Sequence, residues 1–315
     1  MNRFFLLIFL FWGTITFAQT KNPAFKIVPL GVKGGIDEGN LSAYMLAPEH
    51  SNNYICLDAG TLHAGIEKAI TNKVFTIPAE QVLRRYIKGY LISHAHLDHL
   101  AGLVINSPDD TAKNIYAFAD CIGTFKSHYF TWKSWANFAD AGETPQLKKY
   151  HYVTLAADSE TRINNTAMTV KAFPLSHANL TSTAFLVRTG ENYLLYLGDT
   201  GPDEIEKSHN LENLWKAVAP LIREKKLKAI MIEVSFPDEQ PDKSLFGHLT
   251  PRWLMKELHQ LENYAGAGAM YGFNLVVTHV KPPQKSIENI KIQLAAENDL
   301  ELNLIYPRQG TKLDL

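Results

Sequence analysis

Short apolar segments recur along the chain and alternate with polar or glycine-containing turns. This pattern is typical of buried strands, and it predicts strands at residues 54–57, 90–93, 170–173, 184–187, 193–197, 229–232 and 275–277. Two later segments instead repeat apolar residues every three or four positions, and each follows a proline. They predict helices after Pro251 and after Pro283. The alternation of strands and helices predicts an α/β protein whose middle part is rich in strands.

Acidic or imidazole side chains follow five of the apolar segments. These residues are Asp58, His94, Asp199, Glu233 and His279. Open α/β sheets gather their binding sites just beyond the carboxyl ends of their strands. Five such placements in one chain therefore predict that these side chains converge on one site.

Residues 93–99 read SHAHLDH and carry the strongest chemical signal in the chain. In extended backbone, His94 and His96 point to the same side, so their imidazoles can bind one cation. If the chain then turns, Asp98 and His99 can reach a second cation nearby. A histidine-rich surface loop is the alternative, but the position directly after a predicted strand favours a metal site.

Three later residues, His177, Asp199 and His279, supply the remaining ligands of a site for two metal ions. Each of them alone is weak evidence, because single histidines and Gly-Asp turns are common in proteins. The predicted sets are His94, His96 and His177 for one ion, Asp98, His99 and His279 for the other, and Asp199 as a bridge. Nitrogen and oxygen donors suit zinc as the first choice, with manganese or iron as alternatives. Asp58 is predicted to orient a ligand imidazole through its free N–H group.

Composition excludes several classes of protein. Of the 315 residues, 46% are hydrophobic and 20% are charged, as in a globular protein with a large core. The formal net charge of −1 provides no basic field to attract a nucleic acid polymer. Two cysteines are too few for a disulfide scaffold, and we expect Cys56 and Cys121 to be buried free thiols. We find no internal repeat or linker, so residues 19–315 are predicted to form a single domain.

The first eighteen residues have the features of a secretory signal peptide. Arg3 precedes an apolar run over residues 4–12, and small residues before and after Phe17 predict cleavage after Ala18. The run is shorter than the roughly 20 residues that span a bilayer, and no later segment is long and apolar enough to do so. We therefore expect the mature chain in the periplasm or outside the cell. Its oligomeric state is left open.

The sequence HAHLDHLAGLVINSP at residues 94–108 resembles the class II cyclic-nucleotide phosphodiesterase family. Supporting segments lie at residues 34–44, 57–61, 180–187, 197–201 and 233–251. The wider set of histidines and aspartates resembles the metallo-β-lactamase fold. The resemblance implies an αββα sandwich of two mixed sheets flanked by helices, with a dinuclear site at one edge. It also implies hydrolysis of 3′,5′-cyclic AMP or cyclic GMP to the 5′-nucleotide, with the choice between the two left open.

Glu233 and His248 are predicted to complete the catalysis of this reaction. Two cations that share a water would lower its pKa to about neutrality and present hydroxide as the nucleophile, with Asp98 both a ligand and a catalytic residue. The leaving 3′ oxygen then needs a proton. We predict that His248 supplies it and that Glu233 keeps the imidazole charged and oriented. A similar Glu/His pair occurs in phosphodiesterases of the tRNA 3′-processing type. The alternative is that Glu233 caps a turn and His248 only precedes a helix.

Candidate substrate contacts rest on weaker signals. Thr200 and Asn40 could donate hydrogen bonds to a phosphate. Residues 128–138 contain five aromatic residues, Trp132 and Trp135 among them. This segment is either a helix that packs an aromatic face on the core or a flap that stacks on the purine base.

Other hydrolases of the same fold are the main alternatives. A β-lactamase is disfavoured by Asp199 and by the pair formed by Glu233 and His248, which a lactam does not require. A sulfatase or another phosphodiesterase stays open, although a tRNA-processing nuclease is disfavoured by the export signal and the net charge. A non-catalytic binding module is disfavoured because all seven predicted ligands are present.

Overall fold

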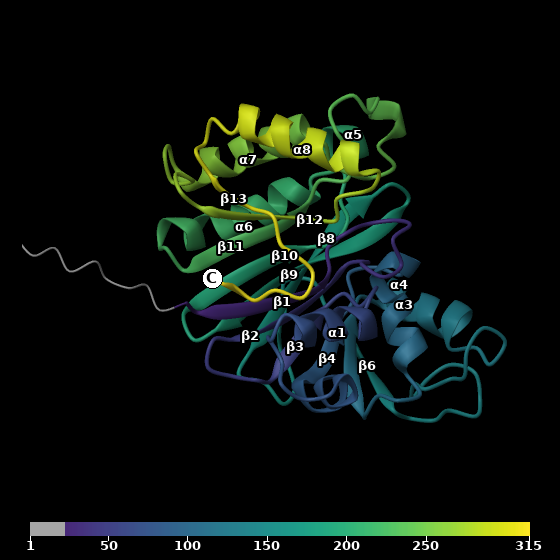
Figure 1. Ribbon diagram of the computed structural model, residues 1–315. Coiled ribbons are helices and arrows are strands. Elements are labelled where there is room, and N and C mark those ends of the chain that lie inside the picture. Colours follow the sequence, from purple (N-terminus) through teal and green to yellow (C-terminus); the bar gives the residue numbers. More distant parts are fainter. Residues whose placement is uncertain (1–22) are drawn as a thin grey trace, which may run out of the picture.

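The computed structural model describes residues 23–315, so the predicted signal peptide lies outside the described residues. Within this range, two seven-stranded sheets pack face to face, and helices cover their outer faces (Figure 1). The chain builds most of the first sheet before it builds the second. Its C-terminal residues then return to pair with the first strand. This arrangement confirms the predicted αββα sandwich.

The first sheet combines antiparallel and parallel pairs. In spatial order its strands are β14 (Leu313–Asp314), β1 (Phe25–Gly31), β2 (Ala43–Pro48), β3 (Tyr54–Leu57), β4 (Ile87–Leu91), β5 (Lys113–Ala117) and β6 (Tyr150–Thr154). Pairing is antiparallel from β14 to β3 and parallel from β3 to β6. The carboxyl ends of the parallel strands therefore lie at one edge.

The second sheet is also mixed. In spatial order its strands are β13 (Asn303–Ile305), β12 (Asn274–Thr278), β11 (Leu227–Glu233), β10 (Asn192–Leu197), β9 (Leu180–Thr189), β8 (Thr169–His177) and β7 (Glu160–Arg162). Pairing is parallel from β13 to β10 and antiparallel from β10 to β7. Both sheets thus fit the prediction of mixed sheets.

Helices lie on both outer faces of the sandwich. Those that follow strands of the first sheet are α1 (His63–Thr71), α2 (Ala79–Gln81), η1 (Val82–Tyr86), α3 (Leu97–Asn106), α4 (Ala119–Thr124) and η2 (Phe125–Tyr129). Those that follow strands of the second sheet are α5 (Asp203–Glu206), α6 (Asn210–Arg223), η3 (Asp242–Ser244), α7 (Pro251–Ala265) and α8 (Gln284–Glu297). The last two begin at or just after the prolines that predicted them.

Three apolar layers hold the sandwich together. Between the sheets, Tyr44 of β2 and Tyr196 of β10 approach with ring centroids 5.8 Å apart. Trp215 of α6 and Leu258 of α7 are fully buried against the second sheet, and Leu103 of α3 is fully buried against the first. Each fully buried side chain of this size contributes about 1.5–3 kcal/mol relative to an exposed one. The two sheets are therefore held firmly enough to align their edges.

The predicted strand at residues 90–93 is displaced in the structure. The strand β4 ends at Leu91, and the backbone N–H of Ser93 donates to Oδ1 of Asp58 at 2.7 Å instead of to a neighbouring strand. The apolar pattern alone did not reveal this side-chain acceptor. The chain therefore leaves the first sheet just before His94.

The helical alternative for residues 128–138 is wrong beyond Tyr129, where η2 ends. Trp132 has a left-handed φ of 59°, which a continuing right-handed helix does not allow. Phe130 is nevertheless fully buried, so the segment is packed on the core without being helical.

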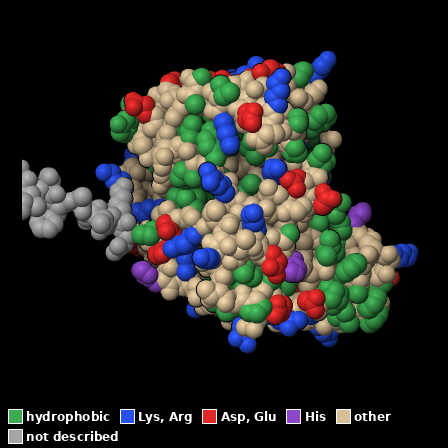
Figure 2. Space-filling view, viewed as in Figure 1, with side chains coloured by type: hydrophobic (Ala, Val, Ile, Leu, Met, Phe, Trp, Pro, Cys, Tyr) green, Lys and Arg blue, Asp and Glu red, His purple; other side chains and the backbone are tan. Residues whose placement is uncertain are grey.

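Figure 2 shows acidic and basic side chains interspersed on the face it presents, in keeping with the net charge of −1. Hydrophobic side chains gather at its lower right, near the loop that follows η2 in Figure 1. The exposed large hydrophobic residues of that loop are Trp132, Trp135 and Leu147. Among the described residues, no helix is both long and apolar enough to span a bilayer.

Candidate metal centre

Strand ends from both sheets bring acidic and imidazole side chains to one edge of the sandwich. His94 follows β4, Asp199 follows β10 and His279 follows β12, while His177 and Glu233 are the last residues of β8 and β11. All five are buried, with at most 2% of each exposed. The convergence predicted from the strand ends is therefore present in the fold.

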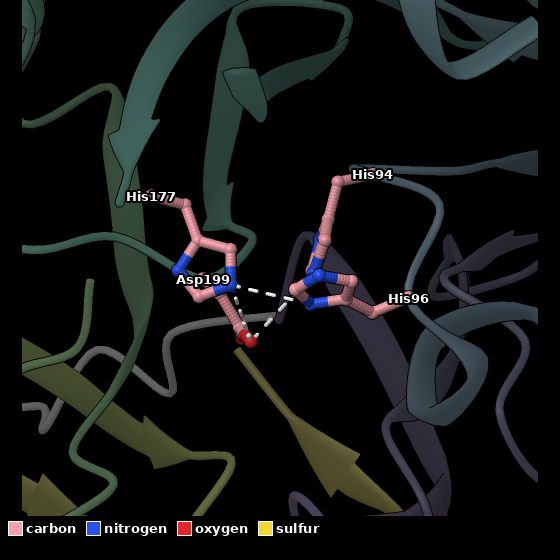
Figure 3. A group of neighbouring side chains, drawn as sticks. All are labelled: His94, His96, His177 and Asp199. Carbon is pink, nitrogen blue, oxygen red and sulfur yellow. Dashed lines mark hydrogen bonds and ion pairs between the residues drawn. The ribbon is translucent and has the colours of Figure 1, made fainter. Parts of the chain in front are cut away.

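One group of possible metal ligands consists of His94, His96, His177 and Asp199, each with one donor atom within 4.8 Å of the others. Figure 3 shows His177 reaching in opposite His94 and His96, with the Asp199 carboxylate beside all three. Nε2 of His177 lies 3.3 Å from Nδ1 of His96. Oδ2 of Asp199 lies 3.8 Å from Nε2 of both His94 and His177. This is the first set that the sequence predicts, together with the predicted bridge.

A second group consists of Asp98, His99 and His279. Nε2 of His279 lies 3.2 Å from Oδ2 of Asp98 and 3.4 Å from Oδ2 of Asp199. Oδ1 of Asp199 lies 3.3 Å from Nε2 of His99. The Asp199 carboxylate therefore contacts both groups, as a bridging ligand must.

The donor atoms fit a divalent cation. Nε2 of His94, Nε2 of His99 and Oδ1 of Asp199 are buried and have no hydrogen-bond partner among the described residues. Most buried polar atoms in proteins have such a partner. Unpaired nitrogen and carboxylate donors aimed at a common centre are what a zinc-type site requires. The fold and this cluster together indicate that the protein binds divalent metal.

Electrostatics favour the ligand forms of three of these side chains, His94, His177 and Asp199. Burial lowers the pKa of His94 well below its usual value and that of His177 to about 4, so both imidazoles are neutral, as metal ligation requires. Burial alone would raise the pKa of Asp199, but the neighbouring His279 and His99 outweigh it and hold that pKa well below its usual range. The Asp199 carboxylate is therefore ionised.

Neighbouring groups orient the imidazoles through their outer nitrogens. Oδ2 of Asp58 lies 2.8 Å from Nδ1 of His99, which is the contact that the role predicted for Asp58 requires. The carbonyl oxygen of Gly247 lies 2.7 Å from Nδ1 of His177. Ser93 and Ser235 contribute hydroxyls 3.0 Å from Nδ1 of His94 and His279, respectively. Such contacts set the tautomer and the ring direction of metal-binding histidines. Sequence reasoning missed both serines and Gly247.

Glu233 and His248 form a buried pair next to this cluster. Oε1 of Glu233 lies 2.7 Å from Nδ1 of His248, which in turn lies 3.8 Å from Oδ2 of Asp199. Burial is the largest influence on both groups. It raises the pKa of Glu233 to about 7, with help from Asp199, and lowers that of His248 to about 4. Both shifts favour the neutral forms of the pair.

Lys281 is a further residue that the sequence analysis missed. Its Nζ lies 2.7 Å from Nε2 of His248 and 5.2 Å from the centre of the Phe236 ring. Lys281 stands two residues beyond His279, in the loop that follows β12. Its position after a strand end was the signal that could have identified it. The lysine places a positive charge directly beside the buried pair of Glu233 and His248.

The predicted substrate contacts lie in different surroundings. Thr200 is fully buried, and its hydroxyl donates to the carbonyl oxygens of Ser176 and Gly201. Oδ1 of Asn40 accepts from the backbone N–H of Val32, which closes the loop at residues 32–40. Both side chains therefore make hydrogen bonds within the fold.

The aromatic segment after α4 lies close to the cluster at one point. The Tyr129 hydroxyl donates to the carbonyl oxygen of Ala95 at 2.7 Å. Trp132 and Trp135 are 41% and 36% exposed, and their indole N–H groups donate to Pro145 and Ser107. Their ring faces are partly free, so base stacking by these two residues stays a prediction.

Comparison with known proteins identifies the family of this chain. The family model of class-II cAMP phosphodiesterases matches residues 23–310. The chain belongs to this family. A 3′,5′-cyclic-nucleotide phosphodiesterase of Aliivibrio fischeri is 44% identical over 310 residues, which cover 94% of each chain. This membership confirms the resemblance seen in residues 94–108. The chain therefore belongs to a family of enzymes.

Solved structures support the fold of this class-II phosphodiesterase. Unliganded yeast PDE1 is similar with a TM-score of 0.79 at 22% identity, covering 93% of this chain and 100% of the yeast chain. The metallo-β-lactamase fold protein YhfI of Bacillus subtilis is similar with a TM-score of 0.62 at 16% identity, covering 93% and 100%. At these identities the likeness concerns the fold alone.

Proposed function

We propose that this class-II phosphodiesterase hydrolyses 3′,5′-cyclic nucleotides, cyclic AMP, cyclic GMP or both, to 5′-nucleotides. Family membership supports the substrate class. The observation that carries the mechanism is the buried contact of 2.7 Å between Glu233 and His248, directly beside the candidate metal centre. A phosphodiester needs both a nucleophile on phosphorus and a proton for the departing oxygen, and the site offers groups for each task.

Two divalent metal ions, zinc as the first choice, would be held by the residues of both ligand groups. The first ion would be held by His94, His96 and His177, the second by Asp98, His99 and His279, and Asp199 would contact both. When bound, such ions supply Lewis acidity toward phosphate oxygens and lower the pKa of water to about neutrality. The chain itself keeps His94 and His177 neutral and the Asp199 carboxylate ionised for this purpose.

His248 would donate a proton from Nε2 to the 3′ oxygen as the bond between phosphorus and that oxygen breaks. Its Nδ1–H group would remain directed at Glu233, whose carboxylate balances the charge of the imidazolium. Burial is the largest of the influences that lower the pKa of His248 to about 4, so its protonated form depends on further negative charge close by. Glu233 supplies part of that charge, and the anionic phosphodiester would supply the rest.

Lys281 would move when substrate binds. In this structure its ammonium lies at Nε2 of His248, the position that the leaving oxygen must reach. A long lysine side chain can swing away while its charge stays close. We therefore assign Lys281 the task of binding a phosphate oxygen once the 3′ oxygen has displaced it from His248.

Export of the enzyme is also part of the proposal. The support is the sequence of residues 1–18, with Arg3, an apolar run and small residues before a cleavage point after Ala18. An enzyme in the periplasm or outside the cell would act on cyclic nucleotide in that compartment. Comparing the N-terminal residue of the protein purified from culture medium, periplasm and cytoplasm tests both the cleavage and the location.

The decisive experiment is hydrolysis of 3′,5′-cyclic AMP and cyclic GMP by the purified chain, with metal content measured on the same sample. We expect the 5′-nucleotide as product and loss of turnover on chelation. A 3′-nucleotide as product would overturn the role of His248, because the 5′ oxygen would then be the leaving group. A chain that binds metal but turns over neither cyclic nucleotide would overturn the proposed substrate class.

A further inference from the structure

Phe246 occupies a backbone conformation that is unfavourable for an aromatic residue. The backbone N–H of His248 donates to the carbonyl oxygen of Leu245 at 3.1 Å, which closes a four-residue turn. The two central residues, Phe246 and Gly247, have φ values of 53° and 78°. Turns with two left-handed central residues are typically made by Asn-Gly, because a bulky side chain at the first position is strained.

Packing does not compensate for this strain, since the Phe246 side chain is 67% exposed. The residues on either side of the turn are, in contrast, buried, with Leu245 1% and His248 4% exposed. A protein that holds an exposed aromatic ring in a strained conformation is expected to use that ring. The exposed ring therefore needs an explanation other than stability.

The turn is attached to the candidate metal centre. The carbonyl oxygen of Gly247 lies 2.7 Å from Nδ1 of His177. A Cβ atom at Gly247 would lie 2.6 Å from the same nitrogen, so only glycine allows this approach. Phe246 therefore lies between the buried residues Leu245 and His248. It directly precedes Gly247, whose carbonyl oxygen contacts His177.

Other exposed apolar residues lie next to residues of the same centre, in the chain or in a strand pair. Leu97 is 62% exposed between His96 and Asp98 in the sequence, and Leu180 is 48% exposed opposite His177 in the pairing of β8 with β9. Ile36 is 84% exposed and follows Gly35, whose N–H donates to Oδ2 of Asp98. Exposed apolar residues thus adjoin, in the chain or in a strand pair, several residues of a centre whose interior is made of charged and imidazole groups. Phe246 is the aromatic residue among these four.

We propose that Phe246 stacks on the base of the cyclic nucleotide and thereby contributes to substrate selection. This inference rests on the proposed function. With the phosphate at the metal centre and the 3′ oxygen at Nε2 of His248, the base is the uncharged end of the substrate and has to point away from the buried polar groups. The flat face of a purine is complementary to an exposed phenyl ring, and stacking of this kind needs no charge on the protein.

The test compares Phe246→Asn with Phe246→Trp in the metal-loaded enzyme. Asparagine suits the turn, so the Asn variant should unfold at the same temperature as the parent or a higher one. It should raise KM for cyclic AMP by about 5- to 150-fold, which is the range expected for loss of one stacked base, with kcat changed less than about twofold. The Trp variant should keep a KM close to that of the parent.

A substrate without a base separates stacking from a merely structural role. The 3′,5′-cyclic phosphate of 1-O-methylribose should be hydrolysed equally well by the parent and by the Asn variant. In calorimetry, binding of 5′-AMP should weaken in the Asn variant while binding of ribose 5-phosphate stays unchanged. Tyr271→Asn is the matched control, because Tyr271 is 71% exposed, precedes a glycine and lies before β12, at the end of that strand away from His279.

Each result is decisive for the inference. An unchanged KM for cyclic AMP in the Asn variant would overturn the role of Phe246, and the same would follow if only Trp132→Ala or Trp135→Ala raised it. An equal loss on the substrate without a base would show that the turn supports the centre and does not hold the base. If the parent enzyme hydrolyses the base-free phosphodiester but no cyclic nucleotide, the proposed function fails first, and the 5′-AMP binding measurement still decides the stacking.

Discussion

Oδ2 of Asp58 lies 2.8 Å from Nδ1 of His99. Both oxygens of this buried carboxylate make hydrogen-bond contacts. Oδ2 of Asp58 contacts Nδ1 of His99 and accepts from the hydroxyls of Ser93 and Tyr196, while Oδ1 accepts from the backbone N–H of Ser93. Burial opposes a positive charge on His99, but Asp199 and Asp58 together outweigh it and raise the pKa of His99 well above its usual value. The Asp58 carboxylate thus links three parts of the fold at the edge where the candidate ligands lie. These are the end of β3, the loop after β4, and strand β10.

Asp58→Asn should weaken metal binding. The amide cannot carry the charge that orients the His99 imidazole, and changes of this type typically cost about 10- to 100-fold in metal affinity. Titration of the metal-free protein with zinc against a competing chelator measures the effect. Asp109→Asn is a suitable control because its carboxylate is 79% exposed. Equal zinc affinity in the parent and in Asp58→Asn would refute the orienting role.

His248→Ala should lower kcat for cyclic nucleotides by about 10²- to 10⁴-fold while the metal content stays the same. The loss should shrink toward zero for a phosphodiester with a p-nitrophenolate leaving group, because that group departs without a proton. Parallel kinetics on both substrates, with metal analysis of each preparation, separate the protonation step from damage to the site. An equal loss on the two substrates would argue against protonation by His248.

Removal of metal should destabilise the folded chain. Without a cation, the buried Nε2 atoms of His94 and His99 and the buried Oδ1 of Asp199 have no hydrogen-bond partner within residues 23–315. Metal that binds only the folded state stabilises it by about 2.7 kcal/mol at a concentration 100-fold above its Kd. Thermal unfolding with chelator, and again after zinc or manganese is restored, measures this difference. Asp199→Asn should respond much less to the same treatment, and an identical response would contradict the assignment of Asp199.

Both cysteines should be unreactive in the native protein. Cys56 and Cys121 are free and buried, as the sequence analysis expected, and burial raises the pKa of each thiol well above its usual value. A thiol reagent reacts with the thiolate, so neither residue should be labelled before unfolding. Labelling should yield two thiols in denaturant, and a reducing agent should leave the melting temperature unchanged. Rapid labelling without denaturant would contradict this expectation.

Lys113→Met should cost about 3–5 kcal/mol of stability. The Lys113 ammonium pairs with the buried Asp110, which also accepts from the hydroxyls of Tyr90 and Tyr150. Burial lowers the pKa of Lys113, but removing the lysine would leave a buried carboxylate without its counter-charge. Urea unfolding of the single variant and of Lys113→Met combined with Asp110→Asn measures the coupling. The double variant should recover part of the loss, and a further loss of the same size would show that the two residues act independently.

Local sequence determined much of this protein. The apolar runs placed most strands of the second sheet, and the prolines before residues 252 and 284 marked the helices α7 and α8. The spacing in SHAHLDH and the acidic or imidazole residues after strand ends pointed to every residue that the fold gathers into the two candidate groups described above. These features are readable because a strand, a helix start and a short chelating motif each depend on residues only a few positions apart.

The tertiary structure decided which of these residues meet. The hydroxyl of Ser235, the carbonyl oxygen of Gly247 and the ammonium of Lys281 face the imidazoles of His279, His177 and His248 only because the fold brings together strand ends and loops of the second sheet. The same packing turned the hydroxyl of Thr200 into the fold and left the Phe246 ring exposed. A single sequence does not show which of these groups touch, since the contacts to the imidazoles join residues 33 to 70 positions apart through the packing of the second sheet and its loops.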